Sequence, residues 1–256
     1  MTHNACKIVS NQEIAPDIFE IVLDTRDFPM SAPGQFVMIY LDRGELLLPR
    51  PISICRQEKN ITLLVYKVAG NGTEYMSTLK SGDALRITGP LGNGFTIKEG
   101  LKKIALIGGG IGIPPMVSIF DKLKGKDIEI DVFLGFKKEH FLTNLFSGAH
   151  LRVISEDIDA FAKQPYPSGD VFAKSGNPIT LLAHYGADYD EIYACGPKPM
   201  LAALSRYAED KNVPLQVSLE ERMACGIGVC MGCVTPPSYM KICCVGPVFY
   251  SDKVDI

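Results

Sequence analysis

The sequence of 256 residues has no run of 18 apolar residues, the length that a membrane-spanning helix needs. Its most apolar stretch, residues 104–120, is interrupted by four glycines and two prolines. The first residues, Met-Thr-His-Asn-Ala-Cys-Lys, lack the apolar core of a signal peptide. We therefore expect a cytoplasmic protein without a membrane partner, whose eight cysteines stay reduced or bind metal.

Strong charge and hydrolytic motifs are missing as well. The net charge of −3 gives no reason to expect a nucleic-acid partner. The sequence has no legible Ser–His–Asp arrangement or carboxylate pair, and we assign no catalytic residue. The four histidines do not have the spacing of metal ligands; they are His3, His140, His150 and His184.

What is present begins with a β-rich segment from residue 4 to about residue 98. Short apolar runs bounded by Gly, Pro, Asn and Asp predict strands at 37–40, 52–54, 61–68 and 84–88. Strands at such intervals favour a small antiparallel barrel.

Two motifs in this segment suit a phosphate. Arg50-Pro51-Ile52-Ser53 places a cation beside a strand, although a solvated arginine is an equal interpretation. Gly70-Asn-Gly72-Thr73 precedes a helix expected at 74–80, and the N–H groups of such a turn can bind a pyrophosphate. An ordinary helix capped near Thr73 would have the same sequence.

From Lys103 the pattern changes to strands alternating with helices. Strands are expected at 104–107, 128–134, 151–155 and 191–195, and helices at 116–123 and 199–208. This alternation predicts a doubly wound parallel sheet.

Two turns at the carboxyl ends of these strands are candidates for nucleotide binding. Gly110-Ile-Gly112 has the first two glycines of a dinucleotide fingerprint, but Pro115 stands at the third position. Cys195-Gly196-Pro197 ends another strand, and we expect the Cys195 thiol to face the crevice. A purely structural glycine turn is the alternative, and residues 135–139 do not discriminate NAD from NADP because they contain both acidic and basic side chains.

The C-terminal stretch contains Cys225, Cys230 and Cys233, with Cys243 and Cys244 ten residues later. C-x4-C-x2-C followed by a distant cysteine is the ligand pattern of plant-type 2Fe–2S centres. A structural zinc site, which usually has two separated knuckles, and inert or redox thiols are the alternatives. In extended backbone, the side chains of Cys243 and Cys244 would point to opposite sides, so only one of them would bind the cluster. The spacing does not show which one. The other would be a small buried hydrophobe, and Cys6 and Cys55 are expected to pack in cores.

Together, Arg50 to Ser53, Gly72-Thr73, Gly110 to Pro115 and Cys195 to Pro197 resemble the ferredoxin–NADP reductase superfamily. The cysteine stretch, with Gly246-Pro-Val-Phe249 after it, closely resembles the electron-transfer subunits of type B, NAD-dependent dihydroorotate dehydrogenases. The resemblance spans nearly the whole chain. Its implied organisation is an FAD-binding barrel at 1–99, an NAD-binding α/β domain at 100–217 and a 2Fe–2S module at 218–256.

The resemblance also implies site residues. The cluster ligands would be Cys225, Cys230, Cys233 and Cys243. The NAD site would include Gly110, Gly112, Pro115 and Cys195-Gly196-Pro197. The FAD contacts would be Arg50, Pro51, Ile52, Ser53, Val65, Tyr66, Lys67, Gly72 and Thr73. The loop from Cys233 to Cys243 is shorter than the resemblance leads us to expect, so its path is not predicted.

The implied function is electron transfer from dihydroorotate, oxidised on an FMN-containing partner in a heterotetramer of two plus two chains, through the cluster and FAD to NAD+ in pyrimidine synthesis. A TIM barrel for that oxidation needs about 250 residues, which this chain cannot spare. The rivals are a diaphorase subunit of a hydrogenase or of a ferredoxin–NADP transhydrogenase, and a non-enzymatic nucleotide-binding module with structural zinc.

Overall fold

The computed structural model describes residues 2–157, 159, 161, 170–172, 176–185, 188–235 and 239–256. Its residues group into two compact units: Met1–Gly94 with Glu220–Val248, and Phe95–Leu219 with Phe249–Ile256. The cysteine-rich segment is thus grouped with the N-terminal unit. The division into three segments stays a prediction.

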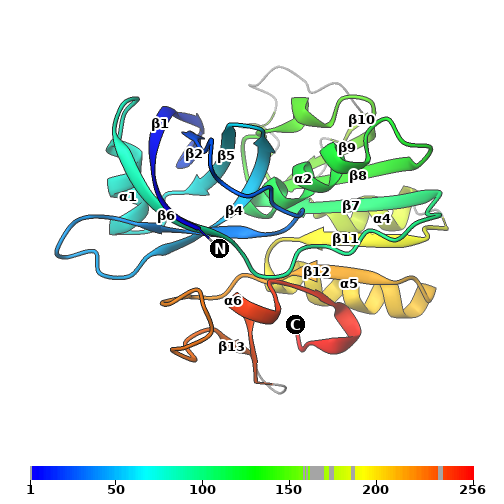
Figure 1. The fold of residues 1–256 in the computed structure, drawn as a ribbon. Helices are drawn as coiled ribbons and strands as arrows, with labels where there is room; N and C mark the ends of the chain where they lie inside the picture. The colour runs from blue at the N-terminus through cyan, green and yellow to red at the C-terminus, as the bar shows by residue number, and fades with distance from the viewer. Residues whose placement is uncertain are drawn as a thin grey trace. The chain divides into compact units, whose positions relative to one another are not determined.

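Six strands of the first unit close into an antiparallel barrel in the order β1-β2-β5-β4-β3-β6 (Figure 1). Their bounds are β1 Thr2–Ala15, β2 Ile18–Asp24, β3 Phe36–Tyr40, β4 Arg50–Glu58, β5 Ile61–Lys67 and β6 Ala84–Leu91. The long strand β1 closes the barrel, because residues 2–7 pair with β6 and residues 8–15 pair with β2. The predicted small antiparallel barrel is confirmed.

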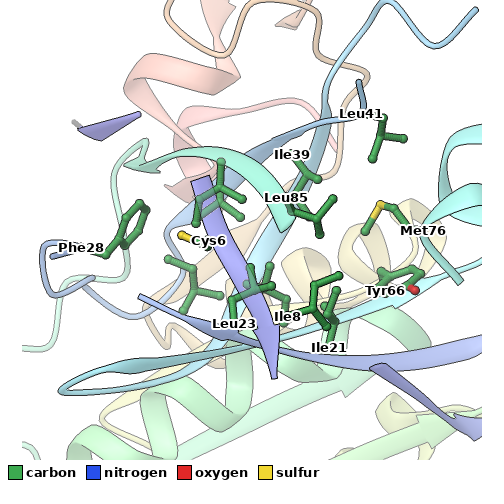
Figure 2. Close-up of a cluster of buried hydrophobic side chains, with 14 of the residues drawn as sticks. Cys6, Ile8, Ile21, Leu23, Phe28, Ile39, Leu41, Tyr66, Met76 and Leu85 are labelled. Atoms are coloured by element: carbon green, nitrogen blue, oxygen red, sulfur yellow. The ribbon is translucent and has the colours of Figure 1, made fainter. Parts of the chain in front are cut away.

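The barrel interior is filled by alternate side chains of its strands (Figure 2). On β2, Ile21 and Leu23 are fully buried, whereas Val22 between them is half-buried. This is the period of two expected for a strand with one face in a core. Cys6 lies in the same core, where burial raises the pKa of its thiol to about 11, so its predicted packing role is confirmed.

Helix α1 runs from Asn71 to Thr78 and therefore begins three residues earlier than the predicted start at 74. Thr73 explains the difference. Its hydroxyl accepts a hydrogen bond from the Ala69 N–H at 2.9 Å and donates one to the Gly70 carbonyl at 3.0 Å. These bonds close the first turn around Gly72, so the glycine-rich stretch forms the beginning of the helix instead of a loop before it.

The second unit contains a seven-stranded sheet in the order β10-β9-β8-β7-β11-β12-β15 (Figure 1). The bounds are β7 Lys103–Gly109, β8 Glu129–Phe136, β9 His150–Ser155, β10 Asp170–Phe172, β11 Glu191–Cys195, β12 Leu215–Ser218 and β15 Val248–Tyr250. The strands from β10 to β12 pair in parallel. The predicted parallel α/β sheet is confirmed.

Short turns and helices connect these strands. A 3-10 turn, Gly110–Gly112, leads from β7 into α2, Ile113–Leu123; α4 is Pro178–Tyr185 and α5 is Lys198–Lys211. Two further 3-10 turns span Thr143–Phe146 and Ser251–Lys253. No helix in the described part of the chain is long and apolar enough to span a membrane.

The cysteine-rich segment contains a two-stranded sheet, β13 Val234–Thr235 with β14 Met240–Lys241, and one helical turn, α6 Ile242–Val245. Residues 236–238 lie outside the described residues. The expectation of extended backbone at Cys243 and Cys244 is wrong, because both lie in α6. Cys243 is buried as a ligand candidate should be, but Cys244 is exposed and is not the buried hydrophobe expected.

A buried carboxylate holds neighbouring strands of the second unit together. Asp131 on β8 is 2% exposed and accepts hydrogen bonds from Arg152 on β9 and from the Tyr189 hydroxyl, both at 2.7 Å. The Lys103 ammonium on β7 lies 3.8 Å away. Burial acts to raise the pKa of the Asp131 carboxyl, but these hydrogen bonds outweigh it and hold the pKa below its ordinary value.

We expect Asp131→Asn to destabilise the chain by about 3 kcal/mol, because it leaves the half-buried Arg152 guanidinium without its charged partner. Equilibrium denaturation followed by circular dichroism would measure the loss. The stabilisation from a depressed carboxyl pKa is present above the unfolded value of about 3.9 and is lost as the pH falls through the folded value. The difference between the two proteins should therefore shrink below about pH 4.

Asp127→Asn is the matched control, since Asp127 forms an exposed ion pair with Lys102. It should leave the denaturation curve almost unchanged. Equal effects of the two substitutions would show that Asp131 has no special role.

Candidate functional site

The four cysteines predicted to bind a cluster come together as two pairs of sulfurs. Backbone-to-sulfur hydrogen bonds link Cys230 with Cys225 and Cys243 with Cys233. A two-iron cluster held by four thiolates needs two ligands on each iron. The arrangement of the sulfurs therefore fits a 2Fe–2S cluster.

Backbone N–H groups are directed at each of these sulfurs. The N–H groups of Gly228 and Gly232 donate to Cys243 at 3.2 Å and to Cys230 at 3.4 Å. The Cys230 N–H donates to Cys225, and the Cys243 N–H donates to Cys233, both at 3.4 Å. Such bonds stabilise thiolates and tune the reduction potential of a bound cluster.

A zinc ion would need four ligands around one centre. Within the described ranges, possible metal ligands gather tightly about one point only at Glu129, Asp131 and His150, and the cysteines are not in that group. Asp131 already binds Arg152 and Tyr189, so this group belongs to the ion network of the sheet. The paired sulfurs favour two metal ions over one.

The cysteine loop, residues 225–233, contains two glycines with left-handed backbone: φ is 69° at Gly226 and 78° at Gly228. A Cβ at Gly226 would lie 2.5 Å from the Met38 Cγ, and one at Gly228 would lie 2.4 Å from the Cys244 sulfur. Both positions therefore need glycine for conformation and for space. The contact at Gly226 also shows that strand β3 of the barrel supports the cysteine loop.

The paired cysteines differ in acidity. Burial acts to raise the pKa of the Cys225 thiol, but N–H bonds from residues 227, 229 and 230 outweigh it and lower the pKa to about 6. Burial and the hydrogen bond with Cys233 raise the pKa of Cys243 to about 12. In the metal-free chain, the thiolate form is therefore more favoured at Cys225 than at Cys243.

The two motifs predicted to bind a phosphate meet in the first unit. A Cβ at Gly72 would lie 2.0 Å from the Arg50 Nε, so the guanidinium lies directly against the first turn of α1. Arg50 also donates to the Leu48 carbonyl. A cation and the N–H groups of a helix N-terminus in one place could hold a pyrophosphate.

The other predicted flavin residues lie on neighbouring strands. Pro51, Ile52 and Ser53 follow Arg50 on β4, and all are half-buried. On β5, Val65 is buried and Lys67 is exposed. The Tyr66 side chain lies inside the barrel core, where it stacks on Phe19 and its hydroxyl bonds to Asn11, so only its backbone is available to a ligand.

The two motifs predicted to bind NAD also meet. Gly112 lies so close to the end of β11 that a Cβ would be 2.4 Å from the Cys195 carbonyl oxygen and 2.6 Å from the Gly196 nitrogen. Pro115 lies in the first turn of α2, and Pro197 precedes α5. Cys195 is only 3% exposed, so the expectation that its thiol faces the crevice is wrong.

Sequence reasoning missed the residues that fasten the cysteine segment to the barrel. The Asn93 backbone N–H donates to the Gly246 carbonyl at 2.6 Å, and its side-chain amide donates to the Val245 carbonyl at 3.3 Å. Met38 contacts the loop at Gly226. A methionine in an apolar strand and an asparagine between glycines have no pattern that predicts these roles.

Comparison with known proteins agrees with this geometry. Residues 220–255 match the model of the iron–sulfur cluster binding domain of dihydroorotate dehydrogenase B. Two curated relatives carry the name dihydroorotate dehydrogenase B (NAD(+)), electron transfer subunit. The protein from Caldanaerobacter subterraneus subsp. tengcongensis is 37% identical over 97% of this chain and 96% of its own length. The protein from Listeria monocytogenes serotype 4b is 35% identical over the full length of both.

A solved structure of an NADH-dependent reduced ferredoxin–NADP oxidoreductase, studied for flavin-based electron bifurcation, has the same fold. It superposes with a TM-score of 0.83, is 26% identical, and covers 98% of this chain and 89% of that one. The barrel, the parallel sheet and the cysteine loop define an iron–sulfur reductase with the ferredoxin–NADP reductase fold. Within that class, the chain belongs to the family of electron-transfer subunits of dihydroorotate dehydrogenase B.

The acidity of the cysteines predicts an order of alkylation in the metal-free chain. Iodoacetamide attacks the thiolate, so Cys225 should be modified with a midpoint near pH 6. Cys243 and the core residue Cys6, whose thiols ionise at about 12 and about 11, should stay unmodified at neutral pH. Peptide mass spectrometry of samples alkylated between about pH 5 and about pH 9 measures the order in which the cysteines are modified. Modification of Cys225 only above pH 8, near the ordinary cysteine value of about 8.5, would contradict it.

Proposed function

We propose that this chain is the electron-transfer subunit of an NAD-dependent dihydroorotate dehydrogenase. It holds FAD and a 2Fe–2S cluster and passes electrons from dihydroorotate, oxidised on a partner subunit, to NAD+ in pyrimidine biosynthesis. The observation that carries the proposal is the cysteine loop with its four paired, N–H-bonded sulfurs. The name of its full-length relatives supports the substrate and the acceptor.

The cofactors supply the redox chemistry, since nicotinamide exchanges hydride, a 2Fe–2S cluster passes single electrons and FAD can do both. The work of this chain is to bind and orient them. Cys225, Cys230, Cys233 and Cys243 act as the cluster ligands. The N–H groups directed at their sulfurs would hydrogen-bond to the ligating thiolates of a bound cluster.

Arg50 and the N-terminal turn of α1 hold the FAD pyrophosphate, with Gly72 leaving room for the guanidinium. The half-buried surface of Pro51, Ile52 and Ser53 faces the flavin, and Thr73, Val65, Tyr66 and Lys67 complete the site. Tyr66 takes part through its backbone because its ring fills the barrel core. The N–H groups at a helix N-terminus match the charge of a pyrophosphate.

The NAD site is formed by Gly110, Gly112 and Pro115 together with Cys195, Gly196 and Pro197. The close approach of Gly112 to the end of β11 supports this grouping. Both turns follow carboxyl ends of parallel strands, where open α/β sheets bind their ligands. Lys137 and Lys138 are exposed beside the half-buried Glu139, so the charges of this stretch do not discriminate NAD from NADP. The choice of NAD therefore rests on the name of the relatives.

The partner is an FMN-containing subunit, and two chains of each kind form a heterotetramer. Support for a protein partner comes from the apolar side chains that the cysteine segment exposes. Ile227, Val229 and Met231 are 47%, 74% and 52% exposed, and Tyr239 and Val245 are exposed as well. A patch of this kind marks a protein contact, and one around the cysteine loop would bring a partner close to the cluster. None of the eight cysteines, all of which lie in the described ranges, forms a disulfide, as expected of a cytoplasmic protein.

A role in ferredoxin–NADP transhydrogenation is the second candidate, favoured by the structural similarity to the bifurcating oxidoreductase over 98% of this chain. The higher identity to the dihydroorotate dehydrogenase relatives makes it the weaker proposal. A hydrogenase diaphorase shares the same motifs. A zinc module without redox activity fits the paired sulfurs poorly.

The test compares the isolated chain with its complex. The chain alone should show flavin absorbance and the EPR signal of a reduced 2Fe–2S cluster, and should oxidise NADH with an artificial dye. It should oxidise dihydroorotate only after addition of the FMN subunit. Cys233→Ala should abolish this coupling and keep the dye reaction, while Cys6→Ala, in the barrel core, keeps both. Dihydroorotate turnover by the isolated chain, or a colourless protein, would refute the proposal.

The flavin site predicts a separate result for Arg50→Ala. Loss of a charge-assisted hydrogen bond of about 1.5–3 kcal/mol should weaken FAD binding roughly 10- to 100-fold. Arg26→Ala is the control, because Arg26 lies on the same barrel and pairs with Asp24 at the surface. FAD titration of the flavin-free proteins, followed by fluorescence, gives the two dissociation constants. If they are equal, Arg50 does not bind FAD.

A further inference from the structure

We propose that Cys244 is an alternative ligand for the iron that Cys243 holds, so that this cluster site has five thiols for four positions. The inference rests on the proposed cluster and adds Cys244 to the four ligands that the family resemblance implies. Three observations on α6 and the loop that faces it carry the inference.

The backbone of α6 places both sulfurs on the same side. Successive side chains of a helix diverge by about 100°, compared with about 180° in a strand. The helical turn Ile242–Val245 therefore leaves the sulfurs of Cys243 and Cys244 only 3.8 Å apart. With metal–sulfur bonds of about 2.3 Å, two thiolates on one tetrahedral ion are separated by about this distance.

Both sulfurs also contact the same residue of the ligand loop. The Gly228 N–H donates to the Cys243 sulfur at 3.2 Å. The Cys244 sulfur fills the space that a side chain at residue 228 would occupy, 2.4 Å from the ideal Cβ position. Gly228 lies between Cys225 and Cys230, so Cys244 lies against the loop that carries half of the ligands.

The two thiols differ in exposure. Cys243 is 2% exposed, whereas Cys244 is exposed to solvent. A cluster ligated through Cys244 would therefore be more hydrated on that side than one ligated through Cys243. Solvent exposure and hydrogen bonds to the sulfurs set the electronic properties of such clusters, so the two forms should have different spectra.

The experiment uses the full chain, purified anaerobically with reductant, as wild type, Cys243→Ala, Cys244→Ala and the double variant. Alanine is chosen because a serine hydroxyl could itself bind iron. Iron and acid-labile sulfide per chain measure cluster content, and EPR of the reduced protein reports the ligand set. Bound FAD, which the barrel holds, reports whether the first unit is folded.

We expect Cys243→Ala to retain the cluster with shifted g values, and Cys244→Ala to keep the wild-type signal. The double variant should lose cluster content at least about tenfold, as expected when a ligand is removed without replacement. Cys233→Ala is the matched control: Cys233 is buried next to Cys243 but has no second cysteine beside it in the sequence, so this variant should also lose the cluster.

Loss of the cluster from Cys243→Ala as complete as from the double variant, with FAD retained, would overturn the inference. Retention of the cluster by the double variant would overturn it too, because another group would then be the replacement. A wild-type chain without any 2Fe–2S signal would instead refute the proposed function, so the two failures are distinct.

Discussion

Close approach at glycine is the constraint on which the candidate ligand sites of this protein depend. At Gly72, Gly112 and Gly228, a Cβ would lie within 2.4 Å of atoms from a distant part of the chain. Those atoms belong to Arg50, to the end of β11 and to Cys244. Each contact joins two motifs that are separate in the sequence, and any side chain at these positions would push the motifs apart.

Backbone dipoles supply much of the electrostatic preparation at these sites. The four paired sulfurs each receive a main-chain N–H, and the flavin and nucleotide motifs both lead into helices. A backbone N–H is fixed by the fold and carries only a partial charge, so it stabilises an anion without itself needing a counter-ion when the site is empty. The one strongly buried side-chain charge described above, Asp131, belongs to the sheet and has its own cations.

The fold class could be predicted from the sequence because strand and helix periodicities are local. Four of the six barrel strands and the parallel strands at 104–107 and 191–195 were found in this way, whereas β1 and β2 were not predicted. The start of α1 could not be, because it depends on the Thr73 hydroxyl bonding backward to Ala69. The motifs of the candidate sites were legible for a related reason: glycine and cysteine spacings are local as well.

What could not be predicted depends on tertiary packing. Cys244 was expected in a strand and buried, but a single helical turn exposes it beside Cys243. Tyr66 lies in a strand with apolar residues on both faces, so the sequence does not show that its ring faces the barrel core. The contacts of Met38 and Asn93 with the cysteine segment join residues far apart in the chain, which no local pattern encodes.

The grouping of the chain has a consequence for how this family can vary. The segment Glu220–Val248 leaves the second unit after Leu219, at the end of β12, and the chain re-enters that unit at Phe249, within β15. Because β12 and β15 are neighbours in one sheet, the segment is an insertion whose two ends are anchored side by side. A change in the length of this segment, or its replacement, would leave the strand order of the seven-stranded sheet unchanged.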